Sequence, residues 1–193
     1  MRKEPRQARS RAMVEAVVEA GTRILGKEGW TALNTNKIAD VAGVSVGSLY
    51  QYFPDKLSLV DAIRRRHLDD CIARMRELET DGRSAADFAR ELVSTVIAAH
   101  SVHPTLHPVL LDEAPTTERF RDPTSAFEIE YLSHFSRVVA AYRQGSAAEI
   151  ETMGQILSDA IDGIIHNAAR RGALGSEAVR GELTRLVRRY LEE

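Results

Sequence analysis

The stretch "IADVAGVSVGSLYQYFPDK" (Ile38–Lys56) decides how the first part of this chain folds. It places Gly43 and Gly47 four positions apart, although each glycine weakens a helix interior by about 1 kcal/mol relative to alanine. Gly43 sits where a chain leaving a helix usually enters the left-handed region, a conformation that is cheap only for glycine. The stretch therefore predicts two short helices joined by a tight turn, which is the helix-turn-helix unit.

Polar residues mark where both short helices begin. Asn34 or Thr35 can cap the first one, "NKIADVA", and Ser45 can cap the second, from Val46 to about Phe53.

A helical wheel at about 100° per residue separates two faces on the second helix. Leu49, Phe53 and Val46 fall on one side and predict its buried face. The remaining residues, which we expect to point outward with a tyrosine at either edge, are Gly47, Ser48, Tyr50, Gln51 and Tyr52.

This outward face suits the major groove of duplex DNA, which has base edges at its floor and phosphates along its walls. Gln51 can form a bidentate pair with adenine, and Gly47 lets the backbone come close to the floor. The hydroxyls of Ser48 and the two tyrosines are placed to contact phosphates. Ser45 and the free N–H groups at the helix start add an anion site.

Composition is that of an ordinary soluble protein. The chain has 193 residues, of which 44% are hydrophobic and 28% charged. No stretch approaches the roughly 20 apolar residues of a membrane span, and no apolar run follows the basic start as in a signal peptide. The single cysteine, Cys71, excludes an internal disulfide and favours a reducing, cytoplasmic location.

Charge is distributed unevenly. Residues 1–56 hold nine basic and six acidic residues, a net charge of +3, whereas the remainder carries −5. We expect the basic arm 1–11, with Arg9 and Arg11, to help the helix-turn-helix bind a polyanion.

Helical periodicity runs through the whole chain and predicts an all-α fold of about nine helices. A first helix closes at Gly29, and Ser84 is the expected cap of a helix that runs to about His103. Later helices are expected near 55–80, 123–144, 147–171 and 176–191. Two prolines break the segment 100–115 into an irregular helical piece. Pro104 spoils the spacing of its histidines, so we expect no metal site there.

Two wide apolar stripes near the C-terminus predict a dimer interface of four helices. The stripes equally fit helices that face only their own core, and the pattern does not choose between these alternatives. The expected interface residues are Met153, Ile156, Leu157, Ala160, Ile161, Ile164, Leu183, Leu186, Val187 and Tyr190.

A second set of mostly apolar residues in the middle helices is expected to form core, and part of it to line an effector pocket. The set is Cys71, Met75, Phe88, Leu92, Val96, Leu110, Phe127, Tyr131, Phe135 and Ile161.

The sequence "TNKIADVAGVSVGSLYQYFPDKLSLVDAI" (35–63) resembles the DNA-binding segment of the TetR family of transcriptional regulators. The family pattern is T-x-x-x-I-A-x-x-A-G-V-S-x-G-x-L-Y-x-Y/H-F-x-x-K-x-x-L, and this chain matches every fixed position from Ile38 to Leu59. The resemblance implies a homodimer that binds a near-palindromic operator, usually as a repressor, and that a small molecule releases. It also adds Thr35 and Lys56 to the DNA-contacting set and places Val46 near the bases. One departure is "ALNTN", where Asn34 replaces the second threonine that is common beside Thr35.

We therefore predict a DNA-binding domain over 1–54 and an effector-binding and dimerisation domain over 55–193. The alternative is a helical small-molecule-binding module whose helix-turn-helix is only structural. No motif of an enzyme is present, and we expect no cofactor beyond the unknown effector.

Overall fold

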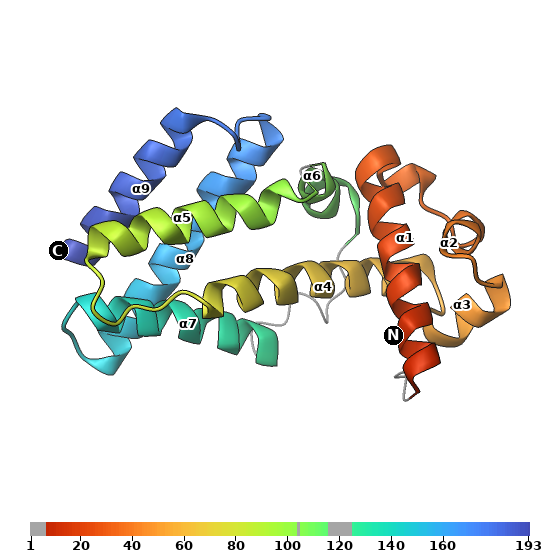
Figure 1. Cartoon of the computed structure of the whole chain (residues 1–193), viewed down its shortest axis with the longest axis horizontal. Helices are drawn as coiled ribbons and strands as arrows, with labels where there is room; N and C mark the ends of the chain where they lie inside the picture. The colour runs from red at the N-terminus through yellow and green to blue at the C-terminus, as the bar shows by residue number, and fades with distance from the viewer. Residues whose placement is uncertain (1–6, 104, 116–124) are drawn as a thin grey trace. The chain divides into compact units, whose positions relative to one another are not determined.

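The computed structural model describes residues 7–103, 105–115 and 125–193. Within these residues all regular elements are helical and no strand occurs (Figure 1). This confirms the predicted all-α fold. The elements are α1 (Ala8–Ala32), α2 (Thr35–Ala42), α3 (Val46–Tyr52), α4 (Lys56–Arg76), α5 (Ala85–Ser101), α6 (Leu106–Pro108), the π-helical turn η1 (Val109–Glu113), α7 (Ala126–Tyr142), α8 (Ala147–Arg170) and α9 (Glu177–Glu192).

The chain folds into two compact units. The first comprises Met1–Asp69 and His103–Arg121, and the second comprises Asp70–Val102 and Asp122–Glu193. The compact unit that holds the helix-turn-helix thus continues beyond residue 54 and takes in a later segment of the chain.

The core of the first unit lies where α1, α2 and α3 pack together. Val17 of α1, Ile38 of α2 and Leu49 of α3 are fully buried in it. Gly29 has φ +80° and ψ 179°, so α1 kinks there and adds one more turn before it ends at Ala32. Sequence periodicity had predicted the end of this helix at the kink.

Serine residues start five of the helices. In each case the hydroxyl accepts a hydrogen bond from the N–H three residues later, which satisfies a donor that has no partner within the helix. Ser84 confirms its expected role at α5, and Ser45 at α3. The full set is Ser45, Ser84, Ser125, Ser146 and Ser176.

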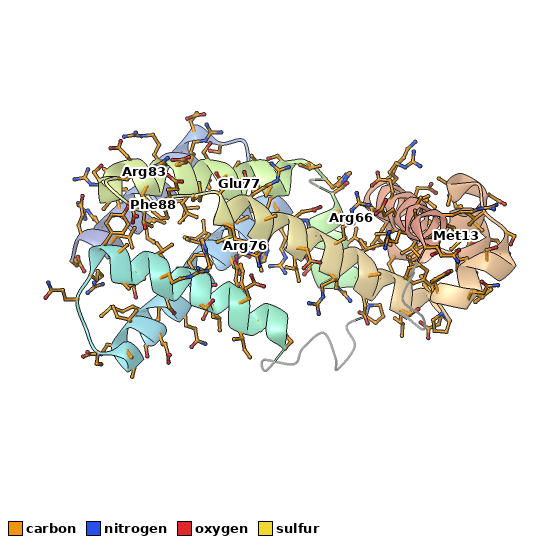
Figure 2. The ribbon with its side chains drawn as sticks, turned by 60° about the horizontal axis from the view of Figure 1, so that its bottom comes forward. Met13, Arg66, Arg76, Glu77, Arg83 and Phe88 are labelled. Carbon is orange, nitrogen blue, oxygen red and sulfur yellow. The ribbon has the colours of Figure 1, made fainter. Side chains whose placement is uncertain are left out.

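In the second unit, α7 packs along α8 and α5 along α9. Helices α7 and α8 approach each other closely at Gly154, where a Cβ would lie 2.7 Å from the backbone nitrogen of Ser136. Phe88, labelled in Figure 2, has a fully buried ring. Its centroid lies 5.6 Å from that of the Tyr142 ring. Gly154 therefore allows α7 and α8 of the same chain to pack closely.

The proline-broken segment forms α6 and η1, and both pack on α1 in the first unit. Leu106, Val109 and Leu110 enter the first core. The prediction that Leu110 lines a pocket together with the residues of the middle helices is therefore wrong. Periodicity could not reveal this, because the segment returns to a core formed by residues far from it in the sequence.

Candidate functional site

The turn between α2 and α3 has the geometry that the sequence predicts. Gly43 has φ +67° and ψ 33°, and its N–H donates to the carbonyls of Ala39 and Asp40. Nothing lies within 4 Å of a Cβ placed there, so conformation rather than space requires the glycine. Asn34 is the cap of α2, and its side chain accepts from the Lys37 N–H at 2.9 Å.

Helix α3 presents one face to the core and the other to solvent. Leu49 is fully buried, whereas Gly47 and Gln51 are exposed and Tyr50 is 43% exposed. A Cβ at Gly47 would meet only the Ser45 hydroxyl, at 3.9 Å. Packing within the chain therefore does not explain why a glycine stands in this helix.

The prediction that Tyr52 points outward is wrong. Its side chain is only 8% exposed and belongs to the first core. The wheel had treated Phe53 as helical, but α3 ends at Tyr52 and Phe53 is extended, with φ −119° and ψ 95°. When Phe53 is left out of the helical wheel, the centre of the buried face of α3 lies between Leu49 and Tyr52. Only the small exposed part of the Tyr52 side chain can then contact a ligand.

Hydroxyl groups are brought together at both ends of this outward face. The oxygens of Thr35 and Tyr50 lie 3.1 Å apart, and those of Ser45 and Ser48 lie 2.8 Å apart. Because a hydroxyl both donates and accepts, each pair can orient one proton toward an external acceptor. Val46 lies at the edge of this face and is half-buried against the core.

Lys56 at the start of α4 is held by α1. Its ammonium donates to the Trp30 carbonyl at 2.6 Å and lies 3.5 Å from the centre of the Trp30 ring. Burial lowers the pKa of Lys56 from its ordinary value. The structure thus gives this lysine an internal role that the resemblance did not predict. The Trp30 carbonyl accepts from only one of the three N–H donors of the ammonium, so the lysine can still donate to a DNA phosphate.

The basic arm is described only in part. Arg9 and Arg11 are exposed in the first turns of α1. Residues 1–6 of the arm lie outside the described residues.

The second unit contains a polar group that sequence reasoning missed. The Tyr131 hydroxyl of α7 donates to both carboxylate oxygens of Asp162 in α8, at 2.9 and 3.0 Å. Burial, then Asp159 and Glu128, raise the pKa of Asp162 to about 6, although the tyrosine hydrogen bond opposes them. Asp162 falls beside the apolar stripe of α8 and not within it, so the spacing of the apolar residues gave no signal for this acid.

Most of the predicted pocket residues lie in the second core. Six are buried, while Tyr131 packs against this core and Cys71 is half-buried. The side chain of Phe127 lies outside the described part of the structure. The six buried residues are Met75, Phe88, Leu92, Val96, Phe135 and Ile161.

Burial, then Asp162 and Asp70, raise the pKa of the Cys71 thiol to about 12. A thiol with a raised pKa is a poor redox sensor, because oxidation requires the thiolate.

Histidines in the second unit serve packing. Buried His100 is bonded through Nδ1 to the Val96 carbonyl at 2.8 Å, and its ring lies 5.6 Å from that of His166. Burial lowers the pKa of His134 to about 4. Among the described residues, no group of three or more His, Cys, Asp or Glu side chains could hold a metal ion.

The apolar stripes of α8 and α9 divide between core and surface. The prediction that Leu157, Ile161, Leu183 and Val187 contact a partner chain is wrong, because all four are buried in their own core. Each apolar stripe is wider than the helix face that packs against the core. Residues on one side of the stripe are therefore buried, and residues on the other side reach the surface. The residues that keep some exposure are Met153, Ile156, Ala160, Ile164, Leu186 and Tyr190.

An open groove of about 500 Å³ runs between α8 and α9 in the second unit. Ile164 and Leu186 contribute apolar surface, and Arg171, Arg185 and Arg189 also line the groove. No described helix is long and apolar enough to cross a membrane.

A helix-turn-helix with a solvated polar face, in a chain whose described elements are all helices, is an arrangement typical of DNA-binding regulators. Comparisons with known proteins agree. Residues 17–63 match the model of the bacterial regulatory proteins of the tetR family, and residues 84–191 match the tetracyclin repressor-like C-terminal domain. The chain belongs to the TetR family of transcriptional regulators.

Two relatives from Rhodococcus jostii (strain RHA1) are similar over most of the chain. The HTH-type transcriptional repressor KstR2 is 26% identical over 77% of this chain and 89% of its own length. The repressor KstR is 25% identical over 87% of this chain and 78% of its own. The crystal structure of the regulator FadR from Bacillus subtilis shares the fold, with a TM-score of 0.71, 17% identity and coverage of 93% and 97%.

Proposed function

We propose that this protein is a transcriptional repressor that binds a near-palindromic operator as a homodimer and releases it when a small molecule binds in the second unit. The observation that carries the proposal is the outward face of α3. There Gly47, Tyr50 and Gln51 are exposed, while Leu49 anchors the opposite side in the core.

Helix α3 docks in the major groove in this proposal. Its seven residues span about 10 Å, which fits within a groove about 12 Å wide. Gln51 contacts a base edge, with Val46 and Gly47 close to the floor, and the hydroxyls contact phosphates. The remaining proposed contacts are Thr35, Ser45, Ser48, Tyr50, Arg9 and Arg11, with lesser contributions from Lys56 and the edge of Tyr52.

A dimer follows from the size of the reading helix. One α3 covers only one half-site, whereas two heads about 34–36 Å apart engage successive major grooves. The exposed Ile156 and Leu186, at 51% and 40%, and the groove between α8 and α9 offer the apolar surface for this contact. A monomeric mass by light scattering at micromolar concentration would contradict it.

The effector binds among the middle helices of the second unit in this proposal. Cys71 and Tyr131 are the members of the expected set that are half-buried, and Tyr131 leads to the half-buried carboxyl of Asp162. The FadR structure was solved with stearoyl-CoA, which supports a site for a small molecule in a chain of this fold. An effector releases DNA only by its difference in affinity for the two states of the protein.

We place the protein in the cytoplasm, where an operator and a reducing environment are both available to a chain with one cysteine. We keep residues 1–54 as its DNA-binding domain, to which Lys56 adds a contact from the start of α4, and 55–193 as its effector-binding and dimerisation domain.

Selection of bound duplexes from random DNA tests the proposal. We expect a two-fold symmetric consensus, with affinity that falls linearly in a plot of log K against log[salt]. A small-molecule module whose helix-turn-helix is only structural would select no consensus. Its affinity for duplex DNA would also lack this salt dependence.

A further inference from the structure

Lys56 stands at the end of α4 that is least favourable for its charge. It is the first residue of this helix, where the free N–H groups repel a cation and attract an anion. The carboxylate of Asp55 beside it is engaged as a cap and accepts from the Ser58 N–H at 2.7 Å. Among the described residues, no carboxylate forms an ion pair with the Lys56 ammonium. Some other contact must therefore hold this lysine.

Trp30 of α1 supplies both contacts of the ammonium. Its carbonyl accepts from Lys56 at 2.6 Å, and the centre of its ring lies 3.5 Å from the ammonium nitrogen. The carbonyl belongs to the last turn of α1, the end of a helix at which a cation is favoured. Of the aromatic side chains, tryptophan attracts a cation most strongly through the face of its ring. One residue thus provides two favourable partners, and both of them are uncharged.

The position of Trp30 is itself fixed. Gly29, with φ +80° and ψ 179°, kinks α1 immediately before it. The Trp30 N–H donates to the Glu113 carboxylate at 3.3 Å, and the half-buried side chain packs against the first core. Because the ring and the carbonyl are held in place, the ammonium loses its conformational freedom on folding rather than on binding a ligand.

A second lysine of the same unit shows the importance of an uncharged partner. Lys37 of α2 forms an ion pair with the Glu28 carboxylate, which opposes its charge toward any outside anion. Lys56 keeps its full charge, and the Trp30 carbonyl takes only one of its three N–H donors. Its side chain is half-buried, so part of it remains open to a ligand.

We infer that Trp30 is a positioning residue for DNA binding, which holds the ammonium of Lys56 in place for a phosphate of the operator. The inference rests on the proposed function and deepens it by naming the residue that orients one of the proposed contacts. Trp30 does not have to touch DNA itself. Its effect on binding must therefore pass through Lys56, which distinguishes positioning from a role in folding alone.

A double-mutant cycle on the full chain tests this, with the duplex from the selection labelled for fluorescence anisotropy. Trp30→Leu keeps the backbone carbonyl and removes the ring. We expect it to weaken binding about 3- to 10-fold for all duplexes alike, and Lys56→Met to weaken it by at least as much. Lys56→Met should also make the slope of log K against log[salt] shallower by about 0.9 for each half-site. When Lys56→Met is already present, Trp30→Leu should change the affinity by less than about 2-fold.

Lys37→Met provides the matched control, because this lysine makes no printed contact with Trp30 and pairs with Glu28 instead. In the Lys37→Met background, Trp30→Leu should cost the same factor as in the natural protein. Trp30→Phe restores an aromatic face at this position and should recover most of the lost affinity. Should Trp30→Leu fail to fold, Trp30→Met takes its place in the cycle.

The emission of Trp30 gives a second readout that requires no change at this residue. It is the single tryptophan of the chain, so the emission spectrum reports on this ring alone. A charge held over an indole ring changes the energy of its excited state. We expect Lys56→Met to shift the emission of the free protein and Lys37→Met to leave it in place.

The inference is overturned if Trp30→Leu costs the same factor with and without Lys56, or if it leaves binding unaltered or tightens it. It is also overturned if Lys56→Met leaves the emission of Trp30 unchanged. A natural protein that binds no duplex refutes the proposed function as well. One that binds DNA while Trp30 and Lys56 act independently refutes only the role of Trp30.

Discussion

The two units of this protein place the polar groups of their candidate sites in opposite ways. In the first unit the hydroxyls and the glutamine of α3 lie on the surface, over a core that holds the helix in position. In the second unit the notable polar groups, Asp162 with Tyr131 and the histidines, lie among packed helices. A surface of this kind suits a large, rigid ligand such as duplex DNA. Interior polar groups suit a ligand small enough to be enclosed.

The largest effect should come from the tightest packing of the second unit. A valine at Gly154 would place its Cβ 2.7 Å from the backbone nitrogen of Ser136, which cannot rotate away. We expect Gly154→Val to lower the free energy of unfolding by on the order of 3 kcal/mol, measured by denaturant titration. Gly181→Ala in α9 is the control, since nothing lies within 4 Å of that position. It should stabilise by up to about 1 kcal/mol, and an equal loss in both variants would contradict the close approach.

Asp162 should make the second unit sensitive to pH. Its pKa is raised from the ordinary 3.8 to about 6, so between these values the folded state holds a proton that the unfolded state has released. Stability due to this group is complete below pH 3.8 and is lost as the pH rises through 6. We expect Asp162→Asn to remove this decline, on the order of 2 kcal/mol, in melting curves recorded from pH 4 to 7. Exposed Asp159 provides the control, because Asp159→Asn should leave most of the decline in place.

Two serine caps with matched geometry separate stability from function. Ser45 in the first unit and Ser84 in the second each accept from the N–H three residues later at 3.1 Å. Ser45→Ala and Ser84→Ala should each lower stability by about 1 kcal/mol. Only Ser45→Ala should also weaken binding to a duplex, in fluorescence anisotropy titrations. Equal loss of DNA affinity in both variants would mean that Ser45 acts only through folding.

Sequence reasoning succeeded where one local pattern determines the outcome. Gly43, the caps and the buried Leu49 lie within a few residues of one another, and each has a conformation or a partner close in sequence. Tyr52 was misplaced because the end of α3 falls one residue earlier than the wheel assumed. Tyr52 is the one residue of the expected outward face of α3 that this shift moves into the core.

Long-range contacts were beyond the sequence patterns. The position of Leu110 depends on a segment that returns to α1 from more than 70 residues away. Likewise, the stripe of α8 gave no sign of which edge faces α7, so Leu157 and Ile161 were assigned to a partner chain. Family resemblance covers the helix-turn-helix closely and says little about these contacts.

The central claim is that the exposed face of α3 reads bases through Gln51. Repeating the duplex selection with Gln51→Ala tests it most directly, since this exposed side chain has no part in the core. We expect the variant to fold normally, to bind with the same salt dependence, and to lose its preference at the same position in both half-sites. An unchanged consensus at every position would show that α3 does not read DNA through this residue.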